Sequence, residues 1–169
     1  MFNIIVIICT LLFMSETVYA KKHSKPISLS QKGLALIIKF EGFNKKAFWD
    51  YKQWSVGFGS RGTKGEVISR EEAANRLAAE TLDAQLALNS HFPTKFTQAQ
   101  YDALVSFSYN TGTKWMDNSE LAFNINHNNW KKAAEVMQQY TKAGSKTLPA
   151  LVKRRKIESV CFLSGVYND

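Results

Sequence analysis

The sequence predicts an α+β fold that is mostly α, with one small antiparallel sheet after the first helix. Apolar residues recur at helical spacing over most of the chain, and several of these runs open on a Ser/Thr-x-x-Glu/Gln capping box. Between residues 46 and 67 the pattern changes to short β-like runs separated by glycine-rich turns. A helix, a sheet and then several helices in succession indicate the α+β class.

The predicted helices carry start and stop signals. The first is expected to begin near Ser28, which forms a capping box with Gln31, and to end near Glu41 and Gly42, where glycine lets the chain turn. Most later helices open on another capping box or a first-turn proline and stop at a glycine or proline. They are expected over 69–90, 97–112, 118–129, 130–140 and 148–165.

The chain is basic, and its N-terminus indicates export. A formal net charge of +8 over 169 residues predicts attraction to a polyanion, such as nucleic acid, an acidic membrane face or a bacterial wall polymer. Residues 1–20 hold a short apolar run and end in a small-residue motif, so we expect a signal peptide cleaved after Ala20 and a periplasmic or secreted protein. Export weighs against nucleic acid as the partner. A basic leader over 21–27 and one domain over 28–169 would follow.

An uncleaved tether is the alternative to release, because the first 20 residues contain no Lys or Arg. Membrane contact is expected only through such a tether. Cys161 would be the single cysteine after cleavage, so we expect a buried thiol and no internal disulfide. No pair of His or Cys has metal-ligand spacing, and no metal or cofactor is expected.

Glu41 and Asp50 are the strongest candidates for chemistry. Glycoside hydrolysis requires a carboxylic acid at the leaving oxygen and an ionised carboxylate on the other side of the sugar, hence two different environments. Glu41 follows Phe40 at a helix C-terminus, which disfavours its charge, whereas Asp50 falls in a turn between strands. The glycines of Gly57-Phe58-Gly59 would let backbone approach a bulky substrate.

Each of these features also has an ordinary structural explanation. A glutamate at a helix end is usually a solvated surface charge, and an aspartate before a turn is common turn chemistry. A single Gly-x-Gly indicates only a tight turn. The residues alone therefore leave two hypotheses open: that these residues belong to an active site, or that they have only structural roles.

The same stretches resemble a known family. FEG, AFWD and WSVGFGS are similar to the corresponding stretches of phage-type (T4-like) lysozymes, glycoside hydrolase family 24. The resemblance continues through TQAQYDALVSFSYNTG, NSELAFNINHNNWKKAA and AGSKTLPALVKRR, and covers about residues 28 to 165. It implies a lysozyme-like fold, in which the first helix and the sheet pack beside a helical lobe with the cleft between them.

The resemblance also implies an activity. The protein would be a monomeric muramidase that hydrolyses the β-1,4 bond between N-acetylmuramic acid and N-acetylglucosamine in bacterial peptidoglycan, with inversion as the expected course. Glu41 matches the general acid, Asp50 the carboxylate that works with a water, and Ser55 the hydroxyl that holds this water. The positions near sugar contacts are Tyr109, Asn110 and Ser119. Arg154 and Arg155 match a basic pair that we interpret as structural or wall-attracting, not chemical.

The sequence departs from the family pattern in three places. Ser55 stands where the family usually has threonine, Ser60 replaces the common histidine, and the Asp50–Ser55 spacing is one residue short. Three other functions stay open beside the muramidase: a module that binds peptidoglycan without cutting it, a lytic transglycosylase, and a cationic protein that disrupts membranes.

Overall fold

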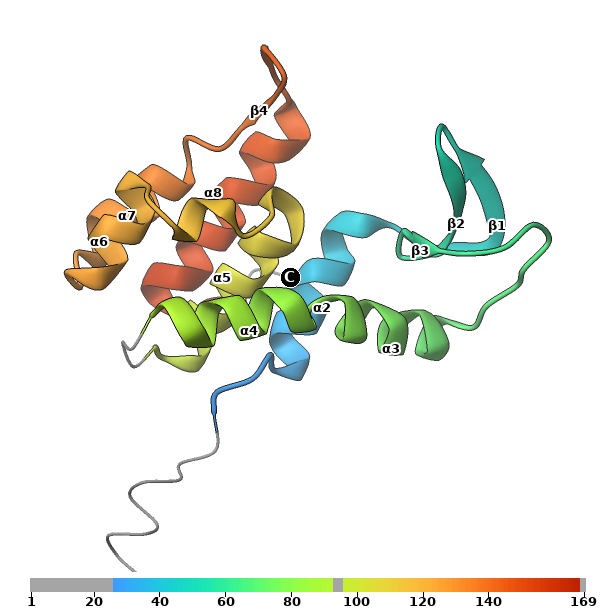
Figure 1. Cartoon of the computed structure of the whole chain (residues 1–169), viewed down its shortest axis with the longest axis horizontal. Coiled ribbons are helices and arrows are strands. Elements are labelled where there is room, and N and C mark those ends of the chain that lie inside the picture. The colour runs from blue at the N-terminus through green and yellow to red at the C-terminus, as the bar shows by residue number, and fades with distance from the viewer. Residues whose placement is uncertain (1–25, 93–95, 168–169) are drawn as a thin grey trace, which may run out of the picture.

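The computed structural model describes residues 26–92 and 96–167, so the expected signal peptide over 1–20 lies outside the described residues. Figure 1 shows a helical body with a small sheet standing to one side of it. The helices are α2 (Gln31–Glu41), α3 (Arg70–Glu80), α4 (Leu82–His91), α5 (Gln98–Thr111), a 3₁₀ turn η1 (Lys114–Met116), α6 (Glu120–Asn126), α7 (Trp130–Met137) and α8 (Pro149–Ser164). The strands are β1 (Asn44–Asp50), β2 (Gln53–Gly57), β3 (Ser60–Arg61), β4 (Lys142–Ala143) and β5 (Lys146–Thr147).

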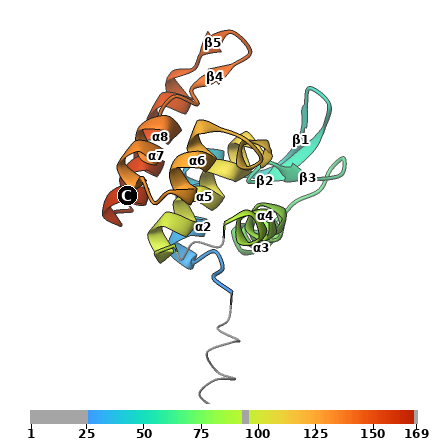
Figure 2. The same ribbon diagram turned by 60° about the vertical axis from the view of Figure 1, so that its left-hand side comes forward.

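The predicted α+β class is confirmed. Helices α5 to α8 form a helical lobe, and β1 to β3 form one antiparallel sheet in that order. A second, two-stranded hairpin, β4–β5, was not predicted, and Figure 2 shows it projecting from the helical lobe. Among the described residues, none of the helices combines the length and the hydropathy that a bilayer-crossing segment requires.

Helix α2 begins later than predicted. Its N-cap is Ser30, not Ser28, and the Ser30 hydroxyl accepts a hydrogen bond from the Gly33 amide at 3.1 Å. The same hydroxyl donates to the buried carboxylate of Asp102 on α5, which also accepts from the Ser30 amide at 2.9 Å. A long-range partner therefore decides which serine caps the helix. The predicted end is confirmed, because Gly42 has φ 68° and closes α2 directly after Glu41.

The sheet is a hairpin with a short third strand. Strands β1 and β2 are joined by Tyr51 and Lys52; we call residues 44–57 the β ribbon. Gly57 has φ 66°, and a Cβ placed there would lie 2.7 Å from the Cβ of Ala73 on α3. Of the two expected glycines, Gly57 thus allows the sheet to approach a helix rather than a substrate, which corrects the sequence-based expectation.

The helix predicted over 69–90 is interrupted once. Ser69 caps α3 by accepting from the Glu72 amide at 3.0 Å, which is one half of the predicted capping box. The Glu72 side chain does not complete the box and accepts from Arg76 at 2.7 Å. At Thr81 the hydroxyl donates to the carbonyl of Ala78 at 2.7 Å, and α4 restarts at the next residue. The two helices run nearly in line along the molecule (Figures 1 and 2) and join the sheet side to the helical lobe.

Helix α5 is the centre of the structure. Its residues from Gln100 to Ser108 are all buried, and it packs against α2, α4 and α8. The predicted capping box is present in both directions: the Thr97 hydroxyl accepts from the Gln100 amide, and the Gln100 side chain accepts from the Thr97 amide. Because α2 and α8 both pack on α5, residues far apart in sequence meet at the end of α2.

Candidate active site

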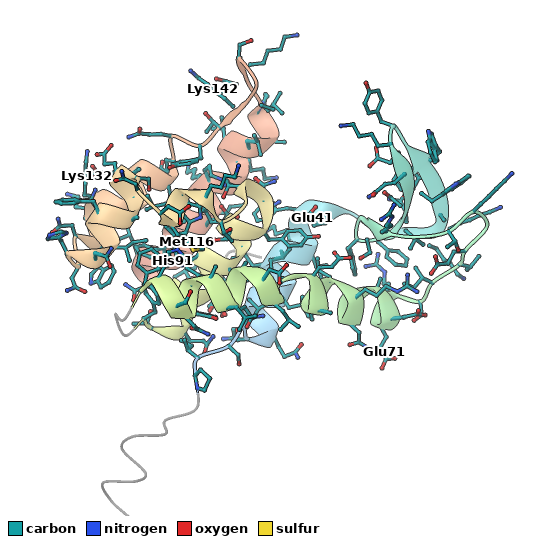
Figure 3. All side chains as sticks on the ribbon, in the orientation of Figure 1. Glu41, Glu71, His91, Met116, Lys132 and Lys142 are labelled. Atoms are coloured by element: carbon teal, nitrogen blue, oxygen red, sulfur yellow. The ribbon has the colours of Figure 1, made fainter. Side chains whose placement is uncertain are left out.

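Glu41 is the last residue of α2, and its side chain is 22% exposed. Figure 3 places it between the helical lobe and the β ribbon. Its Oε1 atom accepts a hydrogen bond from Nη1 of Arg154 at 2.7 Å. The sequence predicted surroundings that disfavour a charge here. The structure corrects this, since a guanidinium lies in direct contact with the carboxylate.

Arg154 is held rigidly by three further contacts. Its side chain is 5% exposed, Nε donates to Oε1 of Glu158 at 3.0 Å, and Nη2 donates to the carbonyl of Ser106 at 3.1 Å. The guanidinium carbon also lies 4.8 Å from the centre of the Phe40 ring. A buried arginine cannot attract a wall polymer, so that part of the interpretation is wrong. The structural role is confirmed, and contact with Glu41 is added to it.

Arg155 extends the same network into the core. Arg155 and Glu158 are fully buried, and Nε of Arg155 lies 3.1 Å from Oε2 of Glu158, an ion-pair distance without hydrogen-bond alignment. Nη2 of Arg155 donates to Oδ1 of Asn110 at 2.7 Å. Burial raises the pKa of Glu158, and the two arginines oppose this shift. The Ser106 hydroxyl also donates to Glu158, at 2.7 Å. We call Arg154, Arg155 and Glu158 the buried ion cluster.

Asp50 lies in a contrasting environment at the end of β1. It is exposed, and its carboxylate has no hydrogen bond or ion pair within the described part of the chain. It pairs with Gln53 across the hairpin, two positions along from the pair Phe48 and Ser55. Side chains alternate along a strand, so Asp50 and Ser55 belong to one face of the ribbon. The two residues thus share a face, as a common role requires.

Ser55 is almost completely buried, with 1% of its surface exposed. Over the residues that the structure describes, its hydroxyl has no hydrogen-bond partner. Ser60, which replaces the family's histidine, has an equally buried and unpartnered hydroxyl. Buried hydroxyls are nearly always paired with protein or water, so the Ser55 and Ser60 hydroxyls each leave a hydrogen bond unused within the described structure.

The three residues that were predicted to contact the sugar differ in burial and in hydrogen bonding. Tyr109 is half-buried, and its hydroxyl donates to Oε2 of Glu80 at 3.2 Å. Burial, then the charges of Glu80 and Glu41, raise the pKa of the Tyr109 hydroxyl, which keeps it a donor. Asn110 is exposed, with Oδ1 occupied by Arg155. Ser119 caps α6 by accepting from the Ala122 amide at 3.1 Å, a structural use that the sequence interpretation missed.

A surface hollow of about 810 Å³ is lined by one of these three residues. Asn110 lines it, and so does Glu120, the neighbour of Ser119. Its other walls come from the ends of α5 and α7 and from β4 and α8, including Tyr140 and Lys142. Neither candidate carboxylate lines it. The hollow therefore belongs to the helical lobe and does not include Glu41.

Sequence reasoning missed the contacts that fix Glu41. Glu158 and Ser106 were not singled out, nor was Glu80, the partner of Tyr109. A sequence signal for Glu158 was present. It follows Arg154 by four residues and Arg155 by three on one helix, which is the spacing of ion pairs. The link from Arg154 to Glu41 spans 113 residues and has no local signal. No group of three or more potential metal ligands is found among the described residues.

Comparison with known proteins agrees with this architecture. The Phage lysozyme family profile matches residues 38–158. The endolysin of Bacillus phage B103 is 35% identical over 145 residues, which are 82% of this chain and 55% of that protein. The endolysin of Acyrthosiphon pisum secondary endosymbiont phage 1 is 33% identical over 144 residues, 81% of this chain and 99% of that protein.

A solved structure extends the likeness to the fold. The endolysin from Escherichia coli O157:H7 phage FAHEc1 superimposes with a TM-score of 0.79 at 30% identity, and covers 87% of this chain and 100% of that one. The chain spans little more than half of the Bacillus phage relative and nearly all of the other two proteins. This chain belongs to the phage lysozyme family, a family of muramidases.

Proposed function

We propose that this protein is itself a muramidase, which hydrolyses the β-1,4 bond between N-acetylmuramic acid and N-acetylglucosamine and so lyses bacteria. Family membership supports the reaction class. One observation carries the proposal further: Glu41 stands at the end of α2, held by Arg154, beside a ribbon that carries the unpaired Asp50. We also assign the chain to the T4-like group, glycoside hydrolase family 24.

Glu41 acts as the general acid. Arg154 engages only Oε1, and Oε2 has no hydrogen bond in the described part of the chain. Oε2 is therefore the oxygen that donates its proton to the glycosidic oxygen as the bond breaks. Because Arg154 is itself fixed by Glu158 and Ser106, the orientation of Glu41 is set before substrate binds.

Asp50 acts on the opposite side of the sugar. As an exposed carboxylate without a partner, it accepts a proton from the attacking water, and the Ser55 hydroxyl on the same face positions that water. Single displacement inverts the anomeric centre and calls for carboxyl groups about 6.5–9.5 Å apart, with room for one water. No cofactor or metal takes part in this scheme.

The helical lobe supplies sugar contacts. Tyr109 offers a protonated hydroxyl near Glu41, and Asn110 offers its amide nitrogen, since Arg155 occupies the amide oxygen. Ser119 contributes by fixing the start of α6 beside the hollow. The sugar-binding roles of these three residues are part of the proposal.

The protein would work outside the cytoplasm as a monomer. Residues 1–20 would direct export with cleavage after Ala20, residues 21–27 would form a basic leader, and 28–169 the catalytic domain. The positive net charge would draw the enzyme to the anionic wall, so high salt should slow lysis.

Replacing Glu41 with glutamine tests the proposal. The amide keeps the size of the side chain and can still accept from Arg154 but cannot donate an acid proton, so clearing of a cell-wall suspension should fall by at least about 10³-fold. Glu72→Gln, which changes an exposed carboxylate on α3, is the matched control and should clear walls normally. A folded Glu41→Gln protein that still clears walls would remove Glu41 from the mechanism.

A further inference from the structure

The β ribbon has a second face, which the proposed chemistry does not use. Trp49 pairs with Trp54 across the hairpin, in register between the pairs that contain Asp50 and Ser55. Alternation along the strands therefore puts the two indoles on the face opposite to these two residues. Their ring centres lie 5.7 Å apart in an edge-to-face arrangement, which confirms that they share this face.

The indole of Trp49 is unusually exposed for its size. Its exposed fraction is 59%, whereas Trp115, in the helical lobe, is 6% exposed, stacks on Phe92 and contacts Phe107 edge to face. Tyr51, in the turn of the same hairpin, is 88% exposed. Large apolar groups that stay exposed together are typical of binding surfaces. We call the exposed Trp49, its edge-to-face partner Trp54, which is partly buried against the core, and Tyr51 of the adjoining turn the outer aromatic face.

Basic residues lie on the same strand and in the same turn as this face. Lys52 lies 6.0 Å from the ring centre of Tyr51. Lys45 and Lys46 are exposed on β1, whereas Arg61 pairs with Ser55 and so belongs to the Asp50 face. Within the described residues, Lys45, Lys46 and Lys52 have no carboxylate in ion-pair distance. An aromatic surface with unpaired cations near it is complementary to a ligand with flat apolar faces and negative charges.

We propose that the outer aromatic face binds a second glycan strand of peptidoglycan, separate from the strand that Glu41 and Asp50 would cut. The inference rests on the proposed substrate. Pyranose rings present C–H faces that stack on indoles, and the peptide stems of peptidoglycan carry carboxylates that can pair with Lys52 and its neighbours. The wall is a mesh, so a ribbon with sugar-binding groups on both faces can contact two strands at once.

A membrane fits this surface less well. Binding to a bilayer interface requires one continuous apolar face. The exposed aromatic side chains of the two strands are divided between the faces of the ribbon, since Phe48 shares the Asp50 face while Trp49 lies on the other. Glycan stacking requires only separate ring platforms, which this geometry supplies.

Binding to purified wall sacculi, free of lipid and teichoic acid, tests the inference. All variants carry Glu41→Gln, so the wall stays intact during the measurement. Trp49→Ala/Trp54→Ala should bind sacculi about tenfold more weakly, because aromatic anchors dominate such contacts. Trp49→Phe should keep most of the affinity. Phe123→Ala removes an aromatic that is 58% exposed on α6, far from the ribbon in sequence, and should bind normally.

The outcomes separate this inference from the proposed function. If the double variant binds sacculi within twofold of its parent, or if the two tryptophans support binding only to anionic lipid vesicles, the inference is wrong. If the protein with intact Glu41 fails to cut sacculi but the tryptophan variants still lose binding, the inference stands and the hydrolase assignment fails. Trp49→Ala alone replaces the double variant if that protein does not fold.

Discussion

The two candidate carboxylates lie in regions that differ in burial and in the partners of their side chains. Glu41 ends a helix that packs on the core, and it contacts an arginine held inside the buried ion cluster. Asp50 ends β1 at the exposed tip of the β ribbon, and its carboxylate has no partner within the described residues. On the helical side the site and the stability of the fold share residues, whereas on the ribbon side they are separate. Mutations in the two regions should therefore have different signatures.

Asp50→Asn should give the largest purely functional effect. The amide cannot accept the proton of the attacking water, so wall clearing should fall by about 10³-fold. Thermal unfolding should be unchanged, because the exposed carboxylate makes no contact that the amide would lose. Turbidity kinetics and a melting curve on the same protein check both halves. A large drop in the melting temperature would show that Asp50 supports the fold and would break the contrast.

Arg154→Met should affect stability and activity together. Removing this buried cation leaves Glu158 and Glu41 with fewer partners, which should lower the free energy of unfolding by about 3–5 kcal/mol. Denaturant unfolding measures the loss. Arg76→Met is the matched control, because Arg76 joins Glu66 and Glu72 at the surface and should cost far less. Equal losses in the two variants would contradict a special role for the buried ion cluster.

Ser55→Ala should reduce activity moderately without loss of stability. Its hydroxyl is buried and unpartnered in the described structure, so removing it should not destabilise the fold, while losing one hydrogen bond to the attacking water should slow clearing about tenfold. Ser55→Thr keeps the hydroxyl and should retain activity. If Ser55→Ala clears walls at the normal rate, Ser55 does not hold the water.

Buried groups in the helical lobe should make the free energy of unfolding depend on pH in alkaline solution. Burial raises the pKa of the Cys161 thiol and of the Tyr101 hydroxyl to about 12, from ordinary values of 9.0 and 10.0. Above about pH 9 the folded state thus holds protons that the unfolded chain releases, so the free energy of unfolding falls as pH rises toward 12. Denaturation curves between pH 8 and 11 measure the slope. Cys161→Ala and Tyr101→Phe should each flatten it, and an unchanged slope would exclude these groups as its origin.

Local patterns were enough to predict much of the fold. The end of α2 at Gly42, the capping box at Thr97 and the α8 boundaries at Pro149 and Gly165 depend on neighbouring residues, and all are confirmed. The start of α2 was misplaced because Asp102, 72 residues away, selects Ser30 as the cap. A contact between segments that are far apart in the sequence leaves no signal in a local pattern.

The candidate site shows the same division between features that a local pattern predicts and features that depend on distant contacts. Glu41, Asp50 and Ser55 could be nominated from their residues and from the family resemblance, but their surroundings could not. The contact between Glu41 and Arg154 depends on α2 and α8 meeting on α5, which is a property of the packed fold. Arg154 was therefore interpreted from the sequence only as structural or wall-attracting, and it proved to be a buried partner of the candidate acid.

The most direct test of a two-carboxylate hydrolase is the identity of its product. Purified sacculi digested by the protein should release fragments that end in reducing N-acetylmuramic acid, and NMR during the first minutes should show the inverted, α-anomer, because Asp50 would direct a water to the far face of the sugar. Fragments that end in 1,6-anhydro-muramic acid, or the β-anomer as the first product, would contradict the account.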